Sequence, residues 1–200
     1  MQGWIFMDKS EKLRWSTLGR KTLFEGPIFD VISVERQAPD GRVGSFIEVD
    51  APLWATVIPW FRDEEGVPHF IMVKQYRHGS DQITIEFPAG TVDEGEDPLE
   101  AALRELREET GYVPTGKVSQ IGEISPNSAF MNNRALFFLV EGVEKVGDQE
   151  LDPNEELDIL KIPVSEVVDS MGYGLYDNGI MMIAQGYFMR YALERGDLLN

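Results

Sequence analysis

The chain has 200 residues, of which 42% are hydrophobic and 10% aromatic, so it can bury the core of one domain with a small appended subdomain. Its 35 Asp and Glu against 18 Lys and Arg give a formal net charge of −17, which argues against binding a nucleic-acid backbone. Zero cysteines exclude disulfides and thiolate metal sites, and only two histidines, His69 and His78, leave carboxylates as the main ligands available to a metal ion.

The sequence carries no signal that would direct the chain to a membrane or out of the cell. It contains no apolar run of about 18 residues that could span a bilayer. Its start, MQGWIFMDKSEKLRW, lacks the apolar stretch of a secretory signal. We therefore expect a soluble cytoplasmic protein that binds no membrane.

Three segments with β-branched and aromatic residues open the chain, at residues 15–23, 28–37 and 43–49, and Pro39-Asp40-Gly41 marks a hairpin turn between the last two. Residues 1–50 are therefore expected to form a three-stranded antiparallel subdomain, and residues 51–200 a second domain. About 35 residues bury little core alone, so we expect the first three strands to contribute to a homodimer.

Further strands and helices are expected along the rest of the chain. The strands are predicted at residues 55–61, 70–76, 82–87, 118–124, 135–141 and 157–162, with helices at 98–110, 164–171 and 179–194. Strands with helices interposed between them are typical of an α/β sandwich.

The helix expected at 98–110 is bounded at both ends. Asp97 is placed to cap its first turn, Pro98 suits the first helical position, and Gly111 suits the position just after the last turn. An apolar stripe with helical spacing is predicted to lie on a sheet, formed by Leu99, Ala102, Leu103 and Leu106.

Glu105, Glu108 and Glu109 project along another edge of this helix. Like charges at this spacing repel one another, and a divalent cation would offset the repulsion. Oxygen ligands suit Mg²⁺ or Mn²⁺. On the helix alone, a solvated surface with Arg104 and Arg107 as ordinary ion-pair partners is the competing interpretation.

The residues around the helix decide between the two. Residues 90–112, GTVDEGEDPLEAALRELREETGY, contain every fixed letter of the pattern G-x5-E-x7-R-E-U-x-E-E-x-G-U, where U is a bulky aliphatic residue. The segment therefore resembles the Nudix box, and it covers 23 of the 200 residues. Tyr112 departs from the aliphatic last position, which affects packing more than chemistry.

The resemblance implies a Nudix fold, an α/β/α sandwich around a mixed sheet, with residues 51–200 as the Nudix hydrolase domain. Carried over position by position, it implies Mg²⁺ or Mn²⁺ held by the backbone carbonyl of Ala89 and the carboxylates of Glu105, Glu108 and Glu109. Arg104 would orient these groups, and Glu96 would support the loop. In such a site the metal polarises phosphate oxygens and activates an attacking water.

Features outside the box resemble the branch of the family that hydrolyses ADP-ribose and other nucleoside diphosphate sugars. They are the segment EFPAG before the box, the QYR ending at Arg77, and the N-terminal extension. Members of that branch are typically homodimers. A proline common in the branch about sixteen residues beyond the box is one residue early here, at Pro126, so we expect broad sugar-nucleotide hydrolysis rather than strict ADP-ribose specificity.

Four further residues are candidates for the site. Arg77 is a candidate phosphate clamp, because a guanidinium binds phosphate oxygens with two hydrogen bonds, and Glu86 a candidate substrate contact in the pocket wall. An acidic loop after the box offers Glu155, and then Glu156, as general base or extra metal ligand. A solvated strand end and a solvated acidic loop are the competing interpretations of these residues.

The expected activity is metal-dependent hydrolysis of the pyrophosphate linkage in a small nucleotide-sugar substrate, which gives a nucleoside monophosphate and a sugar phosphate. Hydrolysis of dinucleoside polyphosphates or modified nucleoside triphosphates is the alternative reaction. A sugar-nucleotide sensor without turnover is the alternative class of protein, but an intact set of box carboxylates favours an enzyme.

Overall fold

A computed structural model describes residues 9–196 of the chain, which divide into two compact units. Among the described residues, the first unit consists of residues 9–51 and 127–133. The second consists of residues 52–126 and 134–196. The first unit therefore takes in a short segment from the middle of the chain.

The first unit is a three-stranded antiparallel sheet in the order β1 (Ser16–Phe24), β2 (Asp30–Gln37), β3 (Val43–Asp50), which confirms the predicted N-terminal sheet. Gly41 adopts a φ of 88° in the predicted turn, a conformation that favours glycine. A short 3₁₀ helix, η1 (Lys9–Leu13), precedes the sheet.

The second unit is built on a seven-stranded mixed sheet. Its strands are β4 (Trp54–Arg62), β5 (Pro68–Arg77), β6 (Gln82–Glu86), β7 (Ala89–Thr91), β9 (Val118–Ile124), β10 (Ala135–Glu141) and β12 (Leu157–Pro163). Five follow the order β12-β5-β4-β10-β9, with β6 paired to β5 and β7 paired to β4. Strands β4 and β10 are parallel, and the other neighbours are antiparallel.

Strand β4 changes partner along its length. Residues 60–62 pair with β5, whereas residues 54–56 pair with β7, the strand that opens the box segment. At its N-terminal end, β4 is therefore separated from β5 and paired instead with the first residues of the box segment. A separate pair of short strands, β8 (Tyr112–Pro114) and β11 (Val143–Lys145), was not predicted.

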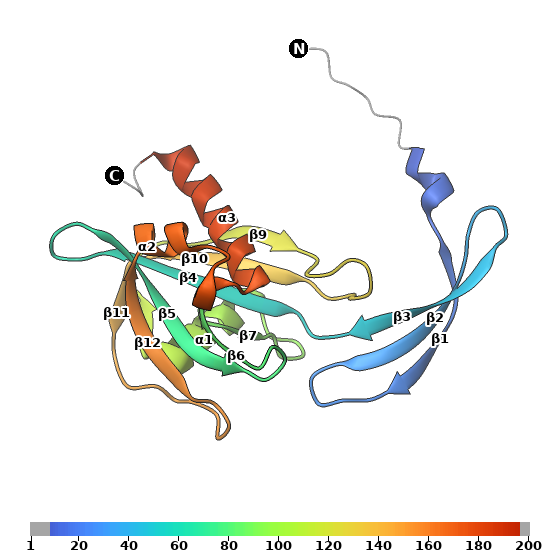
Figure 1. Ribbon diagram of the computed structural model, residues 1–200, viewed down its shortest axis with the longest axis horizontal. Coiled ribbons are helices and arrows are strands. Elements are labelled where there is room, and N and C mark those ends of the chain that lie inside the picture. Colours follow the sequence, from blue (N-terminus) through green and yellow to red (C-terminus); the bar gives the residue numbers. More distant parts are fainter. Residues whose placement is uncertain (1–8, 197–200) are drawn as a thin grey trace, which may run out of the picture. The chain divides into compact units, whose positions relative to one another are not determined.

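Helices cover both faces of the sheet, as expected for the Nudix α/β/α arrangement. Figure 1 shows α1 (Pro98–Thr110) on one face and α2 (Val164–Ser170) and α3 (Gly179–Arg195) on the other. Residues of β4 alternate between the two cores: Ala55 and Val57 pack with α1, whereas Ile58 packs with α3. A short 3₁₀ helix, η2 (Gly174–Tyr176), precedes α3. None of the helices in the described part of the chain is long and apolar enough to span a membrane.

One part of the predicted apolar stripe is wrong. Leu99 is 37% exposed, while Ala101, which was not predicted to be buried, is inaccessible to solvent. Leu99 lies in the first turn of α1, and helical spacing alone does not tell how far the sheet extends beneath that turn. Ala102 and Leu106 are buried as predicted.

Candidate active site

The ends of α1 fix where its carboxylates lie. The Asp97 side chain accepts hydrogen bonds from the backbone N–H groups of Leu99 at 2.8 Å and Glu100 at 3.4 Å. Gly111 ends the helix with a φ of 70°, and a Cβ there would overlap the carbonyl of Gly147. A larger residue could not occupy this position without moving the neighbouring segment.

Glu109, which is buried, and Glu105, which is half-buried, form the centre of the site. Glu109 is 4% exposed and accepts a 3.1 Å hydrogen bond from the backbone N–H of Ala89 in β7. The carboxylate of Glu105 lies against Gly90 in the space that a Cβ would occupy, so a larger residue at position 90 would displace this carboxylate. The backbone of Ala89 and the two carboxylates of α1 therefore lie together at the start of the box segment.

Without a cation, the ionised forms of the Glu105 and Glu109 carboxylates are unfavourable in free energy. Burial, followed by the charge of Glu105, raises the pKa of the Glu109 carboxyl well above its ordinary value. Burial also raises the pKa of Glu105, despite the opposing hydrogen bond from Arg104. A bound cation would stabilise both ionised carboxylates.

Arg104 joins the box loop to the helix. Its guanidinium donates to both carboxylate oxygens of Glu96, at 2.9 and 3.1 Å, and to the Thr91 carbonyl at 3.2 Å. It also donates to Glu105 at 2.8 Å and Glu108 at 3.1 Å. These bonds raise the pKa of Arg104, so its charge is permanent. This geometry suits the expected orienting role of Arg104 and the supporting role of Glu96.

The donor set suits a hard divalent cation. Glu105 and Glu109 supply carboxylate oxygens beside the Ala89 backbone, whereas the Glu108 side chain is 39% exposed and lies at the rim. Within residues 9–196, no three His, Asp or Glu side chains form a complete metal cage. Mg²⁺ fits such an open site, because it retains waters and commonly shares one or two carboxylates with substrate phosphates.

Of the two acidic-loop candidates, Glu155 lies nearer the box carboxylates. Its charge contributes to the raised pKa of both Glu105 and Glu109. Its own carboxylate accepts a 3.2 Å hydrogen bond from the Asp152 backbone. Both Glu155 and Glu156 line a hollow that also contains Lys74, but only the charge of Glu155 acts on the pKa of the box carboxylates. The geometry therefore favours Glu155 over Glu156.

Sequence reasoning missed the residue that fixes the start of this loop. The Gln149 side chain donates to the carbonyl of Glu109 at 2.7 Å and to that of Leu157 at 3.2 Å. The backbone N–H of Glu150 donates to the carbonyl of Glu108 at 2.8 Å. The acidic loop is thus attached to the end of the helix that carries the site, and a single glutamine in a polar loop gave no sign of it.

Arg77 and Glu86 are each other's partners. The guanidinium donates to both carboxylate oxygens, at 3.0 Å from Nε and 2.7 Å from Nη2, and Glu86 is 1% exposed. Burial works to raise the pKa of Glu86, but the hydrogen bonds and charge of Arg77, with help from Thr84 and Asn178, outweigh it and lower that pKa. Glu86 lies in the wall of a cavity, with its carboxylate oxygens already engaged by Arg77 and Thr84.

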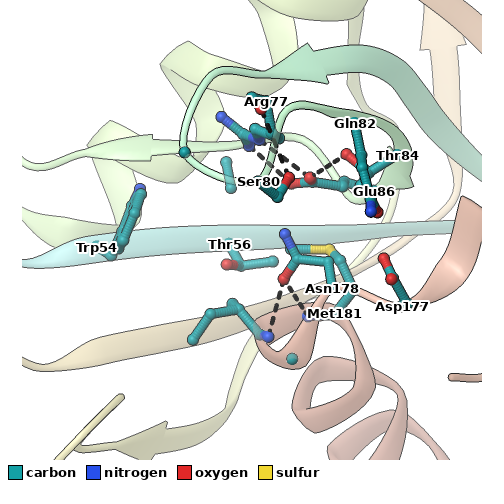
Figure 2. A pocket seen from close by; sticks show the side chains of 14 residues that line it. Trp54, Thr56, Arg77, Ser80, Gln82, Thr84, Glu86, Asp177, Asn178 and Met181 are labelled. Atoms are coloured by element: carbon teal, nitrogen blue, oxygen red, sulfur yellow. Dashed lines mark hydrogen bonds and ion pairs between the residues drawn. The ribbon is translucent and has the colours of Figure 1, made fainter.

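A cavity of about 440 Å³ adjoins this centre. Its lining includes Ala89, so one end of the cavity meets the box segment. Figure 2 shows the side chains of its wall, which come from β4, the β5–β6 hairpin and the start of α3. Sequence reasoning missed Trp54, Thr56, Ser80, Gln82, Asp177 and Asn178. Of these residues, only Thr56 could have been recognised from the sequence, because it is a polar residue inside an otherwise apolar strand.

Comparison with known proteins agrees with this arrangement. The model of the NUDIX domain matches residues 52–176. An ADP-ribose pyrophosphatase of Bacillus subtilis is 28% identical over 159 residues, covering 79% of this chain and 83% of the relative. An ADP-ribose pyrophosphatase of Saccharomyces cerevisiae is 33% identical over 139 residues, covering 63% and 59%. The crystal structure of an ADP compounds hydrolase shares the fold, with a TM-score of 0.77 at 20% identity, covering 92% and 96%.

Proposed function

The chain belongs to the NUDIX family, and from this premise we propose that it hydrolyses the diphosphate linkage of ADP-ribose and other nucleoside diphosphate sugars. The products are a nucleoside monophosphate and a sugar phosphate. The observation that carries the proposal is that buried Glu109 and half-buried Glu105 lie together beside Ala89, at the end of a cavity large enough for part of such a substrate.

Nudix hydrolases use divalent cations, and we propose Mg²⁺, with Mn²⁺ as a substitute, at Glu105, Glu109 and the carbonyl of Ala89. Glu108 would contribute from the rim. The cation supplies Lewis-acid stabilisation of the phosphate oxygens and a more acidic bound water. Arg104 keeps Glu105 and Glu108 in place through its hydrogen bonds to both.

Glu155 is proposed as the general base, with Glu156 as the second candidate. Glu155 lies close enough to influence the pKa of Glu105 and Glu109, and an ionised carboxylate there can accept the proton of an attacking water. Arg77 is proposed as the phosphate clamp. Two of its nitrogens bind Glu86, which fixes the plane of the guanidinium and leaves Nη1 for a substrate oxygen.

Product analysis tests the proposed reaction. With Mg²⁺ present, ADP-ribose should give AMP and ribose 5-phosphate, and UDP- or GDP-sugars should give the nucleoside monophosphate and a sugar 1-phosphate, without free inorganic phosphate. Chromatography of the products on a panel that includes nucleoside triphosphates and dinucleoside polyphosphates makes the measurement. Preferred hydrolysis of the latter compounds would move the protein to the alternative reaction, and tight binding of ADP-ribose without turnover would make it a sensor.

We also propose that a second copy of the chain covers the sheet of the first unit. The β1 strand is almost wholly exposed, and the sheet exposes several large apolar side chains: Leu18, Leu23, Phe24, Phe46 and Ile47. Exposed apolar side chains gathered on one small sheet are typical of an interface.

Light scattering at micromolar concentration should report twice the monomer mass of 22.6 kDa. Phe24→Glu should shift the measured mass towards the monomer, because it places a charge in the apolar contact. Lys21→Glu, an exposed change on the same strand, serves as the control and should leave the dimer intact. A monomeric wild-type chain at every concentration would contradict the proposal.

A further inference from the structure

Thr56 has a buried hydroxyl without a partner. The residue is 1% exposed, and its Oγ1 makes no hydrogen bond in the structure. It lies on β4 and contributes to the wall of the cavity that adjoins Ala89, and Figure 2 shows it between the Arg77–Glu86 pair and Asn178. An unpaired buried hydroxyl lowers stability, and valine has nearly the same shape without that penalty. Threonine at position 56 therefore lowers stability relative to valine, and packing does not explain its presence.

The polar groups around Thr56 show what could pair with it. Glu86 is engaged by Arg77 and Thr84, and the side-chain Oδ1 of Asn178 accepts from the backbone N–H groups of Ile180 and Met181. These groups are already used within the protein. At the exposed mouth of the cavity, the Ser80 hydroxyl donates to the Arg77 carbonyl at 3.5 Å. The polar side chains of Gln82 and Asp177 lie at the same exposed mouth and can face a ligand.

The charges of the cavity disfavour any phosphate beyond the diphosphate that Arg77 is proposed to clamp. Arg77 is neutralised by Glu86, so the carboxylate of Asp177 is the uncompensated charge of the wall. A carboxylate repels phosphate but accepts hydrogen bonds from hydroxyls. The side chains of Gln82 and Thr56 can both donate and accept, as a sugar hydroxyl does. Trp54 adds an apolar ring surface to the same wall.

We propose that this cavity is the subsite for the sugar that leaves as the sugar phosphate, and that the Thr56 hydroxyl binds one of its hydroxyls. The inference rests on the proposed function, because hydrolysis beside Ala89 places the diphosphate at one end of the cavity. Thr56 then acts as a specificity-determining residue at the floor, and Asp177 binds the same sugar at the mouth.

Thr56→Val tests the proposal, since it removes the hydroxyl and keeps the shape. We expect kcat/KM for ADP-ribose to fall about tenfold, in line with the loss of one buried hydrogen bond to substrate. The inhibition constant of ribose 5-phosphate should rise by a similar factor, while that of AMP stays unchanged. Thr56→Ser should restore both constants, and Thr115→Val, at an exposed position outside the cavity, should change neither. The melting temperature of Thr56→Val should equal or exceed that of wild type.

Asp177→Asn provides a second test at the exposed mouth, where misfolding is no concern, and it should also weaken ribose 5-phosphate binding. Unchanged kinetics and binding in Thr56→Val would overturn the proposal. A loss confined to AMP would also overturn it, because the cavity would then hold the nucleoside. Should wild type hydrolyse no nucleoside diphosphate sugar, the proposed function fails, and calorimetry with ribose 5-phosphate on wild type and Thr56→Val decides the subsite separately.

Discussion

Glu109→Gln is expected to lower kcat by at least about a hundredfold, the scale of losing one charge-stabilising group from an active site. Gln keeps the shape and the hydrogen bond from Ala89 but removes the charge that would hold the cation. Steady-state kinetics on ADP-ribose with saturating Mg²⁺ measure the effect. Chelation of the wild-type protein with EDTA should abolish turnover, and added Mg²⁺ or Mn²⁺ should restore it.

Although Glu109→Gln should lower activity, it should not lower the thermal stability of the metal-free protein. Burial and then the charge of Glu105 raise the pKa of Glu109 in the folded protein. In metal-free protein such a carboxyl favours folding while it is protonated, and this contribution is lost as pH rises through the folded-state pKa. Gln cannot ionise, so above that pH the metal-free variant should melt at or above the wild-type temperature. Glu100→Gln, at an exposed position on the same helix, is the control and should keep normal kinetics. A near-normal rate for Glu109→Gln would refute the role of Glu109.

Arg77→Ala is expected to destabilise the protein by about 2–3 kcal/mol, because it leaves the buried carboxylate of Glu86 without its ion-pair partner. This figure lies at or below the lower end for breaking a buried pair, since Arg77 is 36% exposed and solvent screens part of the interaction. The melting temperature should fall by about 5–10 °C for a chain of this length. Differential scanning calorimetry measures the change.

A second substitution separates the structural role of Arg77 from its role in binding. Adding Glu86→Gln to Arg77→Ala removes the unpaired buried charge of Glu86, so most of the lost stability should return. The KM for ADP-ribose should stay raised in the double variant, because the phosphate clamp is still missing. Equal melting temperatures for wild type and Arg77→Ala would show that the pair contributes nothing to stability.

The sequence was most informative where structure is determined locally. The bounds of α1 follow from the cap at Asp97 and the turn at Gly111, which act within one helical turn. Strands β9 and β10 were also placed at their observed bounds. The three-residue strands β8 and β11 could not be predicted, because such short segments carry no periodic pattern.

The site was predictable only in the part that lies on one helix. Glu105 and Glu109 share an edge of α1 by spacing alone, whereas the cavity joins residues more than 100 positions apart, such as Thr56 and Asp177. The pairing of Arg77 with Glu86 depends on the register of β5 and β6, which places both side chains on one face. Register follows from tertiary packing, so each residue could be proposed but not their pair.

The two faces of strand β4 can change independently in evolution, because one lines the cavity and the other supports α1. On one face its side chains Ala55 and Val57 support the helix that carries the proposed metal-binding glutamates. On the other face Trp54 and Thr56 line the cavity. Point substitutions at positions 54 and 56 can therefore diversify the accepted substrate while the support of the helix is inherited unchanged. An inserted residue would exchange the two faces and ruin both at once. Lineages of this fold should accordingly vary this strand by substitution and preserve its length.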